Sequence, residues 1–187
     1  RILVVVPVDE KYFQEAIEKK IEITITQLKQ LGEIFPQNIF HIKFDTGMGR
    51  IGFSVEEVKE VKKIIKTKGI TPVGIFSHFP SAHDESFTLK QIEKFEEILN
   101  QFEEGTFKNV HLQNSLGSIR YNIKSTNLMR LGIGIWGYLS NLEEKEKFGS
   151  ELEESLSLYS RVIQEKDWDG KIGYSLTDDV NGRIATV

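Results

Sequence analysis

The sequence predicts an α/β protein: an incomplete (β/α)8 TIM-type barrel, followed by the beginning of a β-rich C-terminal domain. Short apolar segments alternate regularly with amphipathic helical segments, which indicates a parallel sheet whose faces are covered by helical crossovers. An open doubly wound sheet fits the same alternation. The barrel is favoured because candidate functional groups follow four separate strands, and a barrel gathers the carboxyl ends of its strands at one rim. We expect the barrel over residues 1–140, and a connector with the start of the second domain over residues 141–187.

The first elements follow from hydrophobic pattern and helix-stop signals. The second expected helix ends before Pro36, because a residue that precedes proline is disfavoured in helical conformation. In order, we expect a strand at Ile2–Val6, a helical stretch at Tyr12–Ile17, a strand at Ile21–Thr26, a helix at Leu28–Phe35 and a strand at Ile39–Phe44.

The segment HIKFDTGMGRIGF, His41 to Phe53, joins the third strand to a glycine-rich turn, and Asp45-Thr46-Gly47 is expected to end the strand. Gly47 and Gly49 allow backbone conformations that other residues rarely adopt, so the turn can fold tightly and direct Arg50 across the end of the strand. The segment therefore places a permanent cation at the carboxyl end of a strand, where ligands of α/β folds bind. His41 itself is expected to face the barrel wall or its helices, without a chemical role.

The middle of the chain continues the alternation. Ser54–Glu57 has the pattern of a capping box, and the helix that it begins should end at Gly69. The remaining elements are a strand at Val73–Phe79, a capped helix that begins at Thr88, a fifth strand at Val110–Leu112 and a sixth at Met129–Ile135. A closed barrel has eight strands, so six leave it incomplete.

The pattern changes after Gly137. An acidic connector spans Asn141–Glu154, and Leu156–Ile163 then alternates as an antiparallel strand does. Glycine, aspartate and asparagine between 170 and 182 are expected to mark turns around further short strands. A second, β-rich domain is predicted here.

Composition limits the function. The formal net charge is -4 and basic residues form no stripe, which argues against a nucleic-acid partner. No apolar run approaches the roughly 20 residues that cross a bilayer. Cysteine is absent, which favours the cytoplasm and excludes thiolate chemistry. His78 and His83 lack an accompanying carboxylate pattern, so no metal site is expected.

Four segments resemble the alanine racemase family, the fold-type III enzymes that use pyridoxal 5'-phosphate (PLP). They occur in the family's order with similar spacing: KFDTGMGR at Lys43–Arg50, GIFSHF at Gly74–Phe79, HLQNS at His111–Ser115 and RLGI from Arg130 running to Gly137.

The resemblance implies roles for these residues. Arg130 would face the pyridine nitrogen of PLP and keep it unprotonated, and His111 would hold that arginine in place. Three residues would be catalytic: Tyr174, Arg50 and His78. Arg50 would lie near the phenolic oxygen of the ring, and His78 would pack against the ring. The remaining cofactor contacts would be Lys43, which is carbamylated in many members, the phosphate-binding Ser115, Gly132 and Ile133, and their neighbour Asn114.

The resemblance also implies the activity: interconversion of L- and D-alanine, the bacterial source of D-alanine for cell-wall peptidoglycan. Two bases on opposite faces of the substrate would move the α-proton, namely a lysine and Tyr174 of a partner subunit, so a homodimer is expected. Residue 175 is serine where the family usually has glycine. No segment matches the family's lysine motif, so the chain is interpreted as the central part of a longer enzyme, inactive alone.

Alternatives remain within and outside this activity. A racemase for serine or for a broader set of amino acids has the same motifs. Decarboxylases of the fold place an acid at the pyridine nitrogen, and Arg130 argues against them. A non-catalytic PLP-binding barrel would end with the barrel, against which the predicted second domain counts. An inactive truncated product is the last alternative.

Overall fold

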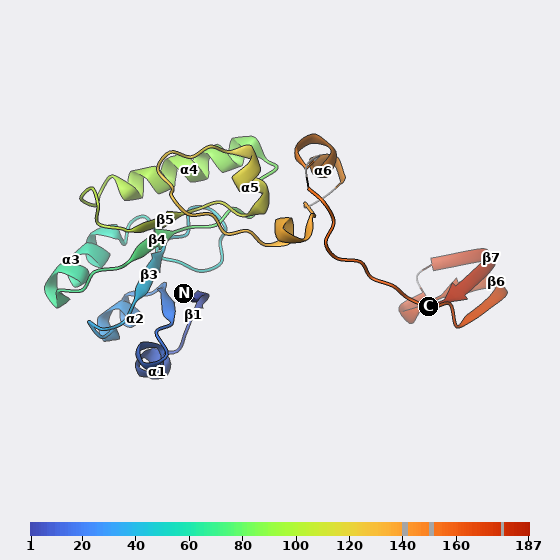
Figure 1. Cartoon of the computed structure of the whole chain (residues 1–187), viewed down its shortest axis with the longest axis horizontal. Coiled ribbons are helices and arrows are strands. Elements are labelled where there is room, and N and C mark those ends of the chain that lie inside the picture. Colours follow the sequence, from blue (N-terminus) through green and yellow to red (C-terminus); the bar gives the residue numbers. More distant parts are fainter. Residues whose placement is uncertain (140–141, 150–151, 177) are drawn as a thin grey trace. The chain divides into compact units, whose positions relative to one another are not determined.

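The computed structural model describes residues 1–139, 142–149, 152–176 and 178–187. Contacts divide the chain into two compact units, Arg1–Glu153 and Glu154–Val187, which are described separately (Figure 1). The predicted domain boundary after residue 140 stays a prediction. No helix in the described ranges is both long and apolar enough to cross a membrane.

The first unit contains a five-stranded parallel sheet in the order β1-β2-β3-β4-β5, which confirms the predicted incomplete (β/α)8 barrel. Sequential strands are neighbours throughout, as in a barrel and unlike the reordered strands of a doubly wound sheet. The strands are β1 (Leu3–Pro7), β2 (Glu22–Ile25), β3 (Phe40–Lys43), β4 (Gly74–Phe76) and β5 (Asn109–His111).

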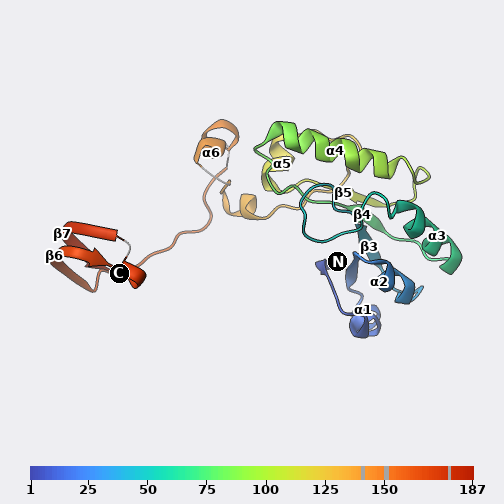
Figure 2. The same cartoon turned by 180° about the vertical axis from the view of Figure 1, so that it is seen from behind.

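Helices pack against one face of this sheet (Figures 1 and 2). Ile23, Ile42 and Ile75 point into a single buried core together with Val61 of α3 and Phe95 of α4. Burial of such side chains is the main stabilising term in an α/β fold. The helices are α1 (Phe13–Glu18), preceded by the 3-10 turn η1 (Glu10–Tyr12), α2 (Leu28–Glu33), α3 (Val58–Lys68), α4 (Glu85–Leu99) and the short α5 (Ser115–Arg120).

The opposite face of the sheet is polar. Successive side chains of a strand point to opposite faces. The registers His41↔Gly74 and Phe76↔His111 therefore place His41, Lys43 and His111 together on the face away from that helix-packed core. All three side chains are buried. Polar groups gathered on this face are the foundation of the site described below.

The helix ends show which local signals the structure uses. The amide of Ser54 donates to the Glu57 carboxylate at 2.7 Å, as expected of the capping box, and α3 ends at Gly69 with φ of +62°. The helix predicted to begin at Thr88 starts earlier, at Glu85, because the Asp84 side chain accepts from the amide of Phe87 and caps it.

The predicted sixth strand, Met129–Ile135, is wrong. Only an isolated bridge pairs Leu128 with His111, and the 3-10 turn η2 (Ile133–Trp136) follows. The amides of Gly132 and Gly134 donate to the Ser115 hydroxyl, so they are used by a side chain and cannot join a strand ladder.

The second unit is a two-stranded antiparallel sheet of β6 (Gln164–Ile172) and β7 (Asp178–Thr186), with the 3-10 turn η3 (Tyr174–Leu176) before β7. Its β-rich character was predicted, but the position of the strands was not. Leu156–Ile163 forms no strand, and the expected turn residues Gly170 and Gly182 lie inside β6 and β7. Part of the expected connector, Leu142–Phe148, forms α6; residues 140, 141, 150 and 151 lie outside the described ranges.

Candidate active site

Loops at the carboxyl ends of β4 and β5, together with the segment from Arg130 to Leu139, line a cavity of about 240 Å³. Arg130 and Ser115 both line it, so the cationic and the phosphate-binding candidates share one space. The residues around it are His78, Asn114, Ser115, Leu116, Arg130, Gly132, Ile133 and Leu139. Six of these eight were predicted as site residues from the sequence.

Arg130 is held by neutral acceptors. Its guanidinium donates to the Nδ1 atoms of His111 and His78, the latter at 3.1 Å, and to the carbonyl of Ser77 at 2.6 Å. The guanidinium carbon lies 5.0 Å from the centroid of the Phe76 ring. No carboxylate lies within ion-pair distance of Arg130 in the ranges that the structure describes. Burial lowers the pKa of Arg130 to about 10, so it is protonated at neutral pH.

The two histidines beside Arg130 are neutral. Burial, followed by the charge of Arg130, lowers the pKa of His111 to about 2 and that of His78 to about 4. A guanidinium can only donate, so both Nδ1 atoms are unprotonated acceptors and both Nε2 atoms carry the proton. His78 therefore contributes hydrogen bonds and no positive charge at neutral pH.

Ser115 organises the other side of the cavity. Its hydroxyl oxygen accepts from the amide of Gly132 at 2.8 Å and from that of Gly134 at 3.1 Å. A hydroxyl that accepts twice keeps one proton to donate. Asn114 caps α5: its carbonyl oxygen accepts from Gly117, and its amide donates to the carbonyl of Phe79.

The glycine-rich turn is built around Asp45, which was predicted only to end the strand. Its carboxylate accepts from the amides of Gly47 at 2.9 Å, Met48 at 2.7 Å and Arg50 at 2.7 Å. Burial raises the pKa of Asp45, but these hydrogen bonds outweigh it and leave the pKa below its ordinary value. As predicted, Gly47 and Gly49 have positive φ, +148° and +67°.

Arg50 and Lys43 lie near this turn but differ in exposure. Arg50 is exposed, and its charge contributes to lowering the pKa of both Lys43 and His78. Lys43 is buried and its ammonium donates to the carbonyl of Ile51. Burial lowers the pKa of Lys43 to about 8, so a fraction of it is the neutral amine at neutral pH.

Tyr174 lies in the second unit and its side chain is fully exposed. The following residue, Ser175, has φ of +68°, a conformation that favours glycine. This conformation is physically consistent with the glycine that the family usually has at this position.

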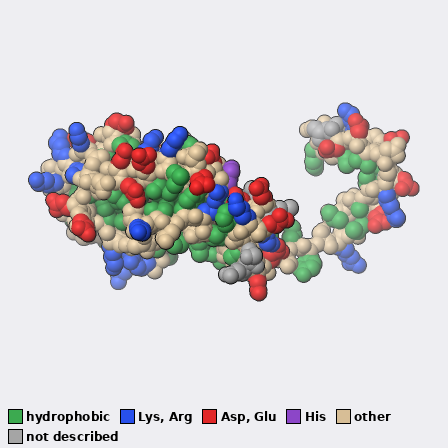
Figure 3. Space-filling model, turned by 90° about the horizontal axis from the view of Figure 1, so that it is seen from above, with side chains coloured by type: hydrophobic (Ala, Val, Ile, Leu, Met, Phe, Trp, Pro, Cys, Tyr) green, Lys and Arg blue, Asp and Glu red, His purple; other side chains and the backbone are tan. Residues whose placement is uncertain are grey.

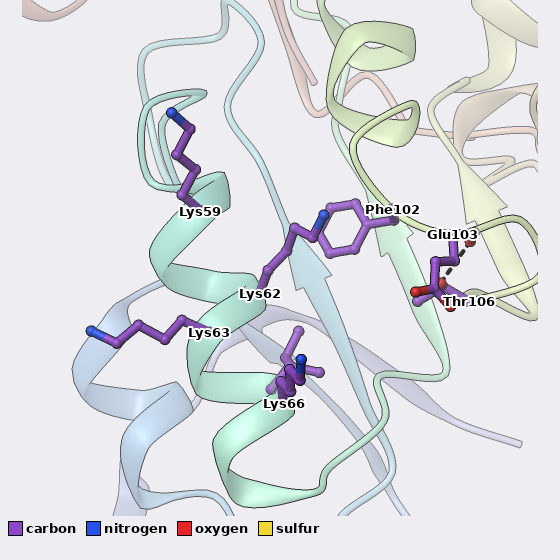
Figure 4. Close-up of a pocket in the computed structure, with 8 residues that line it drawn as sticks. Lys59, Lys62, Lys63, Lys66, Phe102, Glu103 and Thr106 are labelled. Atoms are coloured by element: carbon purple, nitrogen blue, oxygen red, sulfur yellow. Dashed lines mark hydrogen bonds between the residues drawn. The ribbon is translucent and has the colours of Figure 1, made fainter.

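A separate hollow of about 690 Å³ lies over α3 and contains none of the predicted residues. Figure 4 shows Lys59, Lys63 and Lys66 projecting from α3, whereas Lys62 turns toward Phe102. The Lys62 ammonium lies 5.6 Å from that ring and donates to the carbonyl of Gln101. Basic and acidic side chains are interspersed on the face seen in Figure 3. We interpret this hollow as the solvated side of α3.

Among the described residues, no group of three or more histidines, aspartates or glutamates could hold a metal ion.

Comparisons with known proteins agree with this geometry. Residues 1–140 match the family model of the alanine racemase N-terminal domain. The alanine racemase of Fusobacterium nucleatum is 34% identical over 150 residues, which are 75% of this chain and 42% of that protein. The alanine racemase of Staphylococcus epidermidis is 33% identical over 176 residues, 88% of this chain and 45% of that protein. The chain thus spans less than half of these relatives.

Solved structures share the fold. The alanine racemase of Bacillus anthracis with bound L-Ala-P has a TM-score of 0.76 and 28% identity, covering 98% of this chain and 52% of that chain. A histidine racemase of Leuconostoc mesenteroides has a TM-score of 0.72 and 21% identity, covering 98% of this chain and 53% of that chain. At this identity, the similarity establishes a shared fold and nothing about the substrate. Because the family model matches most of the sequence, this chain belongs to the alanine racemase family.

Proposed function

We propose that the full-length protein is a PLP-dependent racemase that interconverts L- and D-alanine. The observation that carries the proposal is the single cavity in which Arg130, His78 and Ser115 meet, each from a different loop. The relatives named alanine racemase support alanine as the substrate.

The residues around the cavity fit PLP. Arg130 is a half-buried cation with neutral partners, so it can face a pyridine nitrogen and keep that nitrogen unprotonated. Ser115 has one hydroxyl proton left for a phosphate oxygen, and the amide of Ile133, the first residue of η2, has no acceptor within that turn. A Cβ at Gly134 would lie 3.0 Å from that of Ser115, so a larger residue there would crowd the serine.

PLP, when bound, supplies the electron sink that acidifies the α-carbon of an amino acid. This chain's residues hold and orient the reactants. Arg50 would lie near the phenolic oxygen of the ring, with Lys43 beneath its turn helping to position it. Neutral His78 would lie against the ring, where its Nδ1 accepts a hydrogen bond from Arg130.

Proton transfer requires two bases on opposite faces of the substrate. We assign one base to Tyr174, supplied by a second subunit. The other would be the lysine of the family's lysine motif, which no segment of this sequence matches. The full exposure of Tyr174 leaves its phenol accessible to a partner. A homodimer, a cytoplasmic location and a role in D-alanine supply for peptidoglycan are parts of the same proposal.

The test uses the full-length protein reconstituted with PLP. We expect a visible absorbance band of bound cofactor, and exchange of the α-proton of L- and D-alanine for deuterium in D2O, followed by NMR. Faster exchange of L-serine or of a larger amino acid would favour the broad-specificity alternative. Cofactor binding without exchange of any amino acid would identify a non-catalytic PLP barrel. Absence of PLP binding would refute the proposal.

A further inference from the structure

A row of buried polar side chains crosses the sheet from Arg130 to Glu22. Arg130 donates to Nδ1 of His111, and Nε2 of His111 lies 2.9 Å from Nδ1 of His41. Nε2 of His41 lies 3.0 Å from Oε2 of Glu22, whose Oε1 accepts from Nε of Arg1 at 2.5 Å. Three strands, β3, β4 and β5, lie between Glu22 and Arg130 in the sequence, but the side chains contact one another in series.

The two ends of this row fix the direction of every hydrogen bond. A guanidinium only donates, so His111 accepts through Nδ1 and, being neutral, carries its proton on Nε2. His41 must then accept through Nδ1 and carry its own proton on Nε2, which points to Glu22. An ionised carboxylate only accepts, so Glu22 completes the series. All donors and acceptors agree with a single arrangement, running from Arg130 through His111 and His41 to Glu22.

A glycine makes the contact between the two histidines possible. His41 is on β3 and His111 is on β5, so their side chains must meet above β4. In β4, the residue paired with His41 is Gly74, and the residue paired with His111 is Phe76. A Cβ at Gly74 would lie 2.2 Å from Nδ1 of His41 and 2.9 Å from the carbonyl of Asn109, which is too close for any side chain. Gly74, the first residue of the GIFSHF motif, therefore leaves the space in which the two histidines contact each other.

The surroundings favour the neutral histidines. Burial lowers the pKa of His41 and outweighs the opposing effect of Glu22. Burial raises the pKa of Glu22, but the hydrogen bonds from Arg1 and His41 outweigh it and the pKa lies below its ordinary value. The Phe76 ring stacks on His111 with centroids 4.6 Å apart and the planes 8° from parallel. Buried polar groups are costly unless paired, and this arrangement pairs each one.

We propose that His41 and Glu22 are positioning residues for Arg130: they hold His111 in the tautomer whose Nδ1 accepts from the guanidinium, and so fix the guanidinium in the cavity. Without Glu22 or His41, His111 could carry its proton on Nδ1. That N–H group would then face an N–H group of Arg130, so that two donors would meet without an acceptor. The catalytic meaning of this relay rests on the proposed racemase function. The tautomer itself does not.

The direct measurement is 15N NMR of histidine-labelled full-length protein, which reports the protonation of each ring nitrogen. His111 is assigned from the signal lost in His111→Gln. We expect neutral His111 with its proton on Nε2 in the wild type. A proton on Nδ1, or an imidazolium at neutral pH, overturns the proposal. The measurement is made on the wild-type protein and needs no variant of Glu22 or His41, so a proton found on Nδ1 would refute the relay even if every such variant fails to fold.

The variants Glu22→Gln and His41→Leu extend the test. We expect each to change the His111 nitrogen signals and to lower kcat about tenfold, the effect of roughly one hydrogen bond, with little change in KM. Thr24→Val is the matched control, because Thr24 lies two residues from Glu22 on the same face of β2 and donates to Val4 instead. It should change neither quantity.

Two outcomes separate this inference from the proposed function. If the signals of His111 change as expected but the wild-type protein racemises no amino acid, the relay stands and the function fails. If the protein racemises alanine while Glu22→Gln and His41→Leu leave the His111 signals unchanged, the function stands and the relay is refuted.

Discussion

Replacing Ser115 with alanine should weaken binding of PLP to the full-length protein. The Ser115 hydroxyl accepts from the amides of Gly132 and Gly134, at 2.8 Å and 3.1 Å. Alanine would remove both this acceptor and the hydroxyl proton that would donate to a phosphate oxygen, and a hydrogen bond to a charged group is worth roughly 1.5–3 kcal/mol. Water in the cavity would replace part of the loss. We therefore expect a net cost of about 1.4–2.8 kcal/mol in binding free energy, which is about 10- to 100-fold in Kd.

The assay is a titration of the full-length apoprotein with PLP, followed by absorbance of the bound cofactor. Ser118→Ala is the control on the same helix: its hydroxyl donates to the carbonyl of Ser115 at 2.8 Å, but Ser118 does not line the cavity. It should bind PLP as the wild type does. Equal affinities for wild type and Ser115→Ala, or an equal loss in Ser118→Ala, would refute this assignment of Ser115.

Three further predictions concern single residues. Asp45→Asn replaces one acceptor oxygen of the three-amide turn with a donor, so we expect a loss of about 2 kcal/mol in the free energy of unfolding by urea. Asp84→Asn should lose little because asparagine caps helices equally well, and equal midpoints for both variants and wild type would contradict the prediction. Tyr174→Phe in the full-length protein should slow α-proton exchange in one stereochemical direction more than in the other; negligible losses in both would remove Tyr174 from the mechanism. Burial lowers the pKa of His111 from 6.5 to about 2, so below about pH 6.5 the unfolded chain binds a proton that the folded protein does not. The free energy of unfolding should then decrease as the pH is lowered, by up to about 1.4 kcal/mol per pH unit for this histidine. A urea midpoint that stays constant from pH 7 to pH 5 would contradict this prediction.

The sheet was predictable from sequence because each strand lies in a short segment rich in apolar residues between helix signals. The sixth strand was not, because its amides bind Ser115, a residue from another loop. Local periodicity does not contain such a contact. For the same reason the alternating run Leu156–Ile163 misled, since a hairpin strand is selected by its pairing partner, and β7 pairs with Gln164–Ile172.

The site was predictable where topology or the family resemblance supplied the answer. Parallel strands bring their carboxyl ends together, which placed Arg130 and Ser115 at one cavity. The supporting residues were missed. Asp45 was seen only as a strand end, and His41 was expected to have no role, although it contacts His111. These contacts depend on strand register, which a single sequence does not reveal.

The polar row across the sheet also makes the fold intolerant of misalignment. Sliding β3 by a single residue would turn His41 toward the helices, so that His111 would lose its acceptor and Glu22 would lose a donor. The isoleucines and phenylalanines on the other face could exchange places at modest cost, because apolar packing is forgiving. Two imidazoles and a carboxylate are not, so the same groups that orient an arginine also select one pairing of four strands during folding.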